Sequence, residues 1–154
     1  MGRIRVITVA GLFPLVMAAC SNGDGNDTGA AGPTEGAAEA SVAVEDSDLG
    51  QIAVDAEGRT LYVFLADEGS ESTCYDECEA SWPPLTVGGD PVAGEGVDGS
   101  LLATTERTDG STQVTLDGHP LYYFAADETP DDMNGQGVGD VWYVVSPEGE
   151  AIEA

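Results

Sequence analysis

The sequence predicts a small all-β domain that contains two related hairpin-based repeats and one short helix, with an α+β domain as the alternative. The first observation is an internal repeat, because a shift of 60 residues places residues 56–68 on residues 116–128 without a gap. Seven identities coincide in that stretch, and the same shift places Trp82 on Trp142. The second observation is a series of short β-branched and aromatic runs separated by glycine turns, which is typical of β-hairpins.

Each repeat has the sequence pattern of a hairpin. Residues 51–54 and 60–65 flank a loop that ends at Gly58, and residues 113–116 and 120–125 flank Asp117-Gly118, a strong turn signal. A further hairpin is expected over residues 104–114, around Asp109-Gly110, and a strand is expected over residues 141–145. Both faces of the 61–66 segment are largely apolar, so we expect it and its twin to be central strands.

One helix is expected before the double proline. Thr73 followed three residues later by Asp76 resembles a capping box, and Pro83 ends the segment. Cys74, Tyr75, Cys78 and Trp82 would then share one helix face and pack on the sheet.

The amino terminus has the pattern of an export signal. A short basic start is followed by an apolar run over residues 6–19, which is too short to span a bilayer. The small residues before Cys20 resemble a bacterial lipobox, which implies cleavage before Cys20 and lipidation of its thiol. The alternative is a plain secretory signal with an incidental cysteine. We therefore expect a signal peptide over residues 1–19, a disordered tether over 20–46, and one domain over 47–154 with repeats at about 49–87 and 101–147.

Only Cys74 and Cys78 remain if Cys20 carries lipid. An even pair outside the cytoplasm favours a disulfide. Redox exchange at this pair and a thiolate metal site remain as alternatives, although the spacing is not that of a Cys-x2-Cys site.

The chain is strongly acidic. It has 29 acidic residues, no lysine and a formal net charge of −25, and Arg59 and Arg107 are its basic residues after the signal. Such a chain repels nucleic acid and anionic headgroups. It suits a basic protein, a cation or a saline medium, although solubility alone would also explain the charge.

Four motifs carry a resemblance to a known family. They are Leu61-Tyr62-x-Phe64-x-x-Asp67, the Cys74-x3-Cys78-x3-Trp82-Pro-Pro-Leu85 block, the second copy with Tyr122, Phe124 and Asp127, and the segment from Asn134 through Trp142 to Pro147. The chain resembles the bacterial secreted-repeat lipoproteins known for a Tyr-x4-Asp motif. The resemblance implies a lipid-anchored protein outside the cytoplasm with tandem copies, and it implies no established activity.

The motif itself has two interpretations. Tyr62 with Asp67, and Tyr122 with Asp127, could form two equivalent functional pockets. We favour the structural interpretation, in which the tyrosines are buried and the aspartates accept backbone N–H groups where the chain turns. Tyrosine and aspartate of one motif also lie on opposite faces of a regular strand, which argues against a shared pocket.

No catalytic constellation is evident in the sequence. His119 lies in a turn without a clustered partner, and Asp127, Asp131, Asp132 and Asn134 do not match a calcium-loop spacing. We therefore expect no enzyme activity, cofactor or metal. The expected function is a non-catalytic binding module, anchored by lipid at Cys20 in the cell membrane and facing outward. An extracytoplasmic redox or electron-transfer accessory that uses Cys74 and Cys78 is the alternative.

Overall fold

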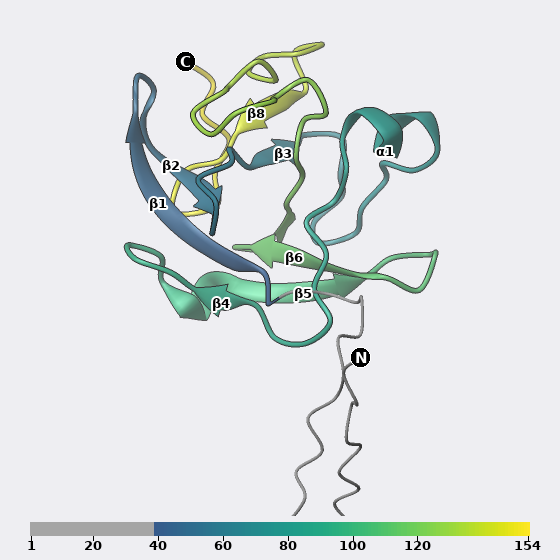
Figure 1. Ribbon diagram of the computed structural model, residues 1–154. Coiled ribbons are helices and arrows are strands. Elements are labelled where there is room, and N and C mark those ends of the chain that lie inside the picture. The colour runs from purple at the N-terminus through teal and green to yellow at the C-terminus, as the bar shows by residue number, and fades with distance from the viewer. Residues whose placement is uncertain (1–38) are drawn as a thin grey trace, which may run out of the picture. The chain divides into compact units, whose positions relative to one another are not determined.

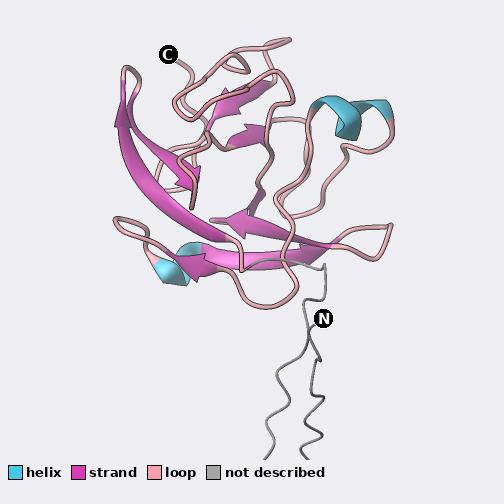
Figure 2. Cartoon of the chain, viewed as in Figure 1, coloured by secondary structure: helices cyan, strands magenta, loops and turns pink. Residues whose placement is uncertain are grey.

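A computed structural model describes residues 39–154 of the chain (Figure 1). This part is mostly strand and loop, with one short α-helix and one 3-10 turn in the described range (Figure 2). The predicted all-β domain with two repeats and a short helix is therefore confirmed. In chain order the elements are β1 (Ser41–Ser47), β2 (Gly50–Asp55), β3 (Tyr62–Phe64), α1 (Glu77–Ser81), β4 (Val92–Ala93), η1 (Gly99–Leu101), β5 (Leu102–Glu106), β6 (Thr112–Leu116), β7 (His119–Pro120) and β8 (Trp142–Val144).

The strands form three small sheets with orders β2-β1-β4, β3-β8 and β5-β6-β7. The hairpin expected over residues 104–114 is confirmed as β5–β6, in which Thr104 lies opposite Val114. The Asp117-Gly118 turn joins β6 to β7, and both of its residues have positive φ, 47° and 78°. A two-residue loop with that geometry matches the twist of the flanking strands, which explains the Asp-Gly pair.

The hairpin predicted in the first repeat forms next to its turn. Val54 bridges Thr60, and the N–H groups of Asp55 and Leu61 donate to the carbonyls of Arg59 and Ala53 at 3.0 and 3.1 Å. The pairing with β2 does not extend to residue 65, because β3 forms its ladder with β8 from the second repeat.

Two predicted boundaries also need correction. The expected tether ran to residue 46, but Ser41–Ser47 forms β1, and Val42 in that strand is fully buried. Hydrophobic burial and pairing with β2 bring this segment into the domain, which begins before residue 47. The helix begins at Glu77 rather than near Thr73, because Thr73 bonds to Asp67 and Asp76 has a φ of 55° that interrupts helical geometry. Cys74 and Tyr75 consequently precede the helix and share no face of it.

The two repeats exchange their backbone partners about a local twofold relation. Tyr62 and Tyr122 donate their N–H groups to each other's carbonyl oxygens, both at 2.9 Å. Next to them, Val145 donates to Leu61 and Leu85 donates to Leu121, at 3.2 and 2.9 Å. The hairpins β1–β2 and β5–β6 therefore form within their own repeats, whereas the segment after each hairpin bonds to a late segment of the other repeat.

Two clusters of buried side chains form the core. One is aliphatic and surrounds Leu61, Leu116, Leu121 and Val145. The other is aromatic and contains Tyr62, Tyr122, Trp82, Trp142 and Cys74. The aromatic cluster holds the residues that the sequence motifs single out, and it positions the candidate site.

Candidate functional site

The tyrosines and aspartates of the two motifs are paired across the repeats. The Tyr62 hydroxyl donates to Asp127 Oδ2 at 2.6 Å, and the Tyr122 hydroxyl donates to Asp67 Oδ2 at 2.6 Å. Both tyrosines are fully buried. The tyrosine of each motif therefore bonds to the aspartate of the other motif. We call Tyr62 and Tyr122 the motif tyrosines, and Asp67 and Asp127 the motif aspartates.

The second oxygen of each motif aspartate holds the loop that follows it. Asp67 Oδ1 accepts from the backbone N–H and the hydroxyl of Thr73, both at 2.7 Å. Asp127 Oδ1 accepts from the backbone N–H of Asn134 at 3.0 Å. The geometry agrees with the favoured structural interpretation, in which these aspartates satisfy backbone groups at turns. Sequence reasoning missed the exchange between repeats, because strand alternation describes contacts within one motif only.

Burial and the hydrogen bonds to the motif aspartates raise the pKa of both motif tyrosines well above the usual value for tyrosine. For Tyr62 the main cause is burial, followed by the hydrogen bond to Asp127, and the N–H of Gly135 partly opposes the shift. For Tyr122 burial again comes first, followed by the hydrogen bond to Asp67. Both phenols therefore remain protonated donors at neutral pH.

Four aromatic rings form a stacked column between the two Tyr–Asp pairs. Trp82 and Trp142 stack at 3.9 Å between centroids with an interplanar angle of 3°. Phe64 stacks on Trp142 and Phe124 stacks on Trp82, each at 4.2 Å. The motif tyrosines meet the tryptophans edge-on, at 5.4 and 5.1 Å. Residues of the two repeats alternate along the column, which ties the repeats together through ring packing.

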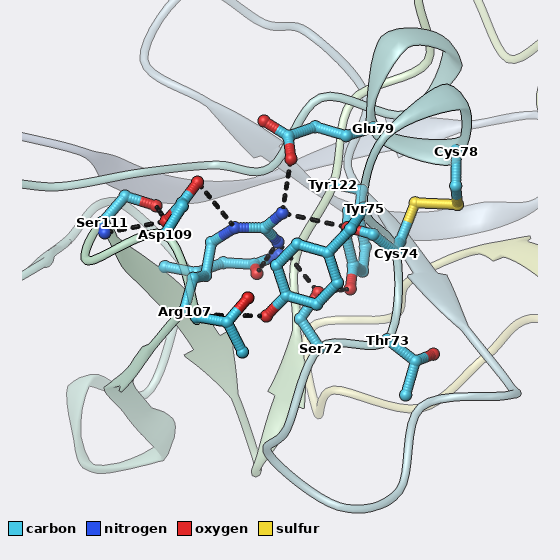
Figure 3. A network of polar contacts seen from close by, with 12 residues as sticks. Ser72, Thr73, Cys74, Tyr75, Cys78, Glu79, Arg107, Asp109, Ser111 and Tyr122 are labelled. Atoms are coloured by element: carbon cyan, nitrogen blue, oxygen red, sulfur yellow. Dashed lines mark hydrogen bonds and ion pairs between the residues drawn. A yellow bond between two sulfur atoms is a disulfide. The ribbon is translucent and has the colours of Figure 1, made fainter.

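A buried arginine organises one half of the site (Figure 3). The side chain of Arg107 is fully buried, and its guanidinium donates to Ser72 Oγ, Gln113 Oε1, the Cys74 carbonyl and Glu79 Oε2 at 2.8–2.9 Å. Because the single Tyr122 proton is donated to Asp67, the Ser72 hydroxyl in turn donates to the Tyr122 hydroxyl oxygen, at 2.6 Å. The guanidinium therefore connects through Ser72 to one Tyr–Asp pair.

Aromatic and acidic groups complete the surroundings of this arginine. Its guanidinium carbon lies 4.4 Å from the ring centroid of Tyr75, and Asp109 Oδ2 lies 3.9 Å from its Nε. Arg107 was not among the predicted site residues, because a lone arginine in a hairpin loop resembles an ordinary surface charge.

The predicted pair Cys74–Cys78 is a disulfide, with Cα atoms 5.2 Å apart. Cys74 is fully buried and its carbonyl accepts from Arg107. The bridge thus fixes the short segment between the arginine network and α1 (Figure 3). At the equivalent positions of the second repeat the chain has Asn134 and Val138, so this crosslink belongs to one repeat.

An open groove of about 440 Å³ lies beside the β1–β2 hairpin. Carboxylates surround it and aliphatic side chains form its floor. Glu45 and Ile52 are register partners in the hairpin, and Thr60 in the returning chain bridges Val54, so these four side chains lie on the same face of the paired segments. The lining residues are Glu45, Asp46, Ser47, Asp48, Ile52, Val54, Gly58, Thr60, Asp131 and Met133.

The remaining candidates from the sequence are engaged in local structure or exposed. Asp132 accepts the N–H groups of Glu128 and Thr129 at 2.9 Å, and these bonds lower its pKa. His119 is exposed in β7. Within residues 39–154 no group of three or more His, Cys, Asp or Glu side chains is arranged to hold a metal ion. In the same range, no helix has the length and apolarity needed to cross a membrane.

Comparison with protein families identifies the two repeats. A family model described as a secreted repeat of unknown function matches residues 43–86 and again residues 103–146, which together make up more than half of the chain. The two matches are separated by the same 60 residues as the internal repeat. Comparison with curated proteins found no match, and comparison with solved structures found none either.

Proposed function

The chain belongs to this family of secreted repeats, and from that premise we propose that it is a lipid-anchored binding module outside the cytoplasm. Its role is non-catalytic, and its partner is a basic protein or another cation. Export of the family as secreted repeats supports the location. The chain has 29 acidic residues and four basic ones, and this excess of negative charge supports a basic partner.

The observation that carries the proposal is the acidic groove. Glu45, Asp46, Asp48 and Asp131 lie around a volume of about 440 Å³, which is within the range of about 300–1,000 Å³ of ligand pockets. An apolar floor with a charged rim suits a side chain that has an aliphatic stem and a cationic head. The groove therefore supplies both parts of the recognition of a basic partner.

Neither arginine within residues 39–154 neutralises this acidic surface. Arg107 is buried in its own network, and Arg59 lies with its guanidinium carbon 4.0 Å from the ring centroid of Tyr123. The lining of the groove contains no basic side chain. Complementary charges of this kind increase the rate of encounter with a basic partner and make it sensitive to salt.

The motif tyrosines support the non-catalytic part of the proposal. Each is fully buried, and its hydroxyl proton is committed to a carboxylate at 2.6 Å. A buried phenol with a raised pKa is a poor base at neutral pH, and it is not exposed to a substrate. The most distinctive residues of the chain therefore serve the fold.

Recovery of a partner from the cell envelope tests the binding role. The mature protein should retain a basic protein at low salt and release it as salt rises. Neutralising the groove with Glu45→Gln, Asp46→Asn and Asp48→Asn should reduce recovery several-fold. The matched control neutralises three exposed acids elsewhere, Glu68→Gln, Asp90→Asn and Glu148→Gln. Equal losses in both variants, or recovery that is indifferent to salt, would contradict the proposal.

The lipid anchor is a separate part of the proposal, because Cys20 lies outside the described residues. Intact-mass analysis of the protein from membranes should show a chain that begins at Cys20 and carries acyl groups. An unprocessed amino terminus without acyl groups would remove the anchor and leave the binding role to be judged by the recovery experiment.

A redox accessory is the second candidate, and the Cys74–Cys78 disulfide is the observation that favours it. Cys74 packs in the aromatic cluster beside the stacked tryptophans. A redox role requires a bridge that the compartment can reduce. A measured reduction potential below about −300 mV would mark the bridge as structural and contradict this candidate.

A further inference from the structure

The groove and the Arg107 network occupy equivalent places in the two repeats. The 60-residue shift places Ser47 on Arg107, and both residues lie at the turn of a hairpin: Ser47 pairs with Gly50, and the N–H of Arg107, directly after β5, donates to the carbonyl of Ser111. By strand register Ile52 lies opposite Glu45 as Gln113 lies opposite Thr105, so Ile52 corresponds to Gln113, one residue beyond the shift because the turn between β5 and β6 is one residue longer. The groove is therefore the counterpart of the space that the Arg107 side chain fills.

The second wall of the groove obeys the same correspondence. Asp131 and Met133 line the groove, and the shift places them on Glu71 and Thr73. Those two residues flank Ser72, which accepts from the guanidinium of Arg107 at 2.8 Å. In one repeat the chain fills this space with its own arginine, whereas in the other it has the short Ser47 and leaves a groove with acidic walls.

A buried hydroxyl in the groove supplies an independent sign of a missing partner. Thr60 lines the groove, is only 3% exposed, and its Oγ1 has no hydrogen-bond partner among the described residues. Buried hydroxyls are normally satisfied, because desolvation without a hydrogen bond is costly. Thr60 shares the face of Val54, whose side chain also lines the groove. A donor that enters over this floor would satisfy it.

We propose that this groove receives an arginine side chain from the basic partner, in the place that Arg107 fills in the other repeat. The inference rests on the proposed function and names the group that is recognised. The aliphatic stem of the incoming arginine lies over Ile52 and Val54, and its guanidinium donates to the rim carboxylates and to Thr60. Arginine suits the site better than lysine, because a planar fork of donors can serve several acceptors together, as Arg107 does.

Calorimetric titration of the mature protein in detergent tests this inference. The probes are three short peptides that carry arginine, lysine or neutral citrulline in a glycine background. The arginine peptide should bind, the lysine peptide should bind at least about fivefold more weakly, and the citrulline peptide should show no binding. Equal affinity for the citrulline or lysine peptide would overturn the proposal.

Ser47→Arg is the decisive variant, because it provides the groove with its own arginine. It should weaken binding of the arginine peptide by about tenfold or more, and the matched control Ser70→Arg, at an exposed site outside the groove, should stay within twofold. Asp131→Asn removes one carboxylate without filling the groove and should weaken binding roughly tenfold, the usual effect of losing a hydrogen bond to a charged group. Thermal melting of each variant controls for folding.

The outcomes separate this inference from the proposed function. If Ser47→Arg binds the arginine peptide as well as Ser70→Arg does, the inference fails. The proposed function survives that result if the protein still recovers a basic partner in a salt-dependent way. If no basic partner is recovered and the arginine peptide does not bind, both fail.

Discussion

The exchange of Tyr–Asp partners predicts energetic coupling between the motifs rather than within them. Tyr62→Phe keeps the ring, which packs edge-on against Trp82 at 5.4 Å, and removes only the hydroxyl. That hydroxyl donates to Asp127 at 2.6 Å and accepts from the buried N–H of Gly135 at 3.2 Å. A hydrogen bond to a charged group contributes about 1.5–3 kcal/mol, so we expect a loss of about 2–4 kcal/mol in the free energy of unfolding once the unpaired N–H is included.

A double-mutant cycle isolates the pair. Combining Tyr62→Phe with Asp127→Ala should give a coupling energy of about 1–3 kcal/mol, because each change removes the same interaction. Combining Tyr62→Phe with Asp67→Ala, the aspartate of its own motif, should be additive within about 0.5 kcal/mol. Urea unfolding followed by tryptophan fluorescence measures all five variants, since Trp82 and Trp142 report on the core that unfolds.

The comparison between the two cycles is what tests the reasoning. Coupling within the motif, between Tyr62 and Asp67, together with additivity across the repeats would refute the exchanged pairing. Additivity in both cycles would show that the short distance of 2.6 Å carries no energetic consequence. A third cycle, Tyr122→Phe with Asp67→Ala, should also show coupling, because Tyr122 donates to the aspartate of the other motif at the same distance of 2.6 Å.

Three further predictions follow from the same contacts. The raised pKa of the motif tyrosines and of Tyr123, which burial and Asp55 also raise, means that the folded state keeps three protons that the unfolded state loses near pH 10. Their contribution to stability is therefore complete below pH 10 and should be lost at higher pH. Urea unfolding at pH 8, 10 and 11 should show stability falling by up to about 1.4 kcal/mol per pH unit for each tyrosine. Arg107→Met should cost about 3 kcal/mol or more, because it leaves buried acceptors unpaired, whereas Arg59→Met should cost less than about 1 kcal/mol in the same assay. Fragments 39–97 and 98–154 should each remain unfolded when alone, because the β3–β8 ladder and the backbone bonds between Tyr62 and Tyr122 need both fragments. Circular dichroism should show that β-structure returns when they are mixed. A single fragment that folds would contradict the exchange.

The fold class was predictable because local signals agree with the final structure. Asp117-Gly118 adopts the positive φ values that its turn requires, and the β5–β6 hairpin forms around Asp109-Gly110 as expected. The predictions were wrong where a segment pairs with residues that are distant in the sequence. β3 leaves its own hairpin for β8, a partner that no local pattern specifies. The start of the domain was placed too late, because Val42 becomes a core residue only by packing in the aliphatic cluster with residues distant in the sequence.

The candidate site was predictable in its residues and unpredictable in its connections. The repeat itself identified the motif tyrosines, the motif aspartates and the tryptophans, and the cysteine pair followed from its even count and its expected compartment. Arg107 and the groove were missed, since each depends on which side chains meet in space. A comparison of Ser47 with Arg107 in the aligned repeats contains the signal, but its meaning is evident only when both positions are seen to face equivalent spaces.

The features that the two repeats share serve the structure of this molecule, whereas we expect the features that differ between them to serve its function. The features that both repeats share, namely the Tyr–Asp pairs and the aromatic column, all bridge the repeats, and their tyrosines and tryptophans are buried. A single repeat would leave two hydroxyl or carboxylate groups without partners and half a column without stacking, so these residues make the tandem arrangement obligatory. The unshared features are the disulfide, the inserted arginine and the groove. The two repeats can differ wherever a side chain makes none of the exchanged contacts, so we expect binding specificity to depend on these differences. The open groove is the one among them that a partner can reach.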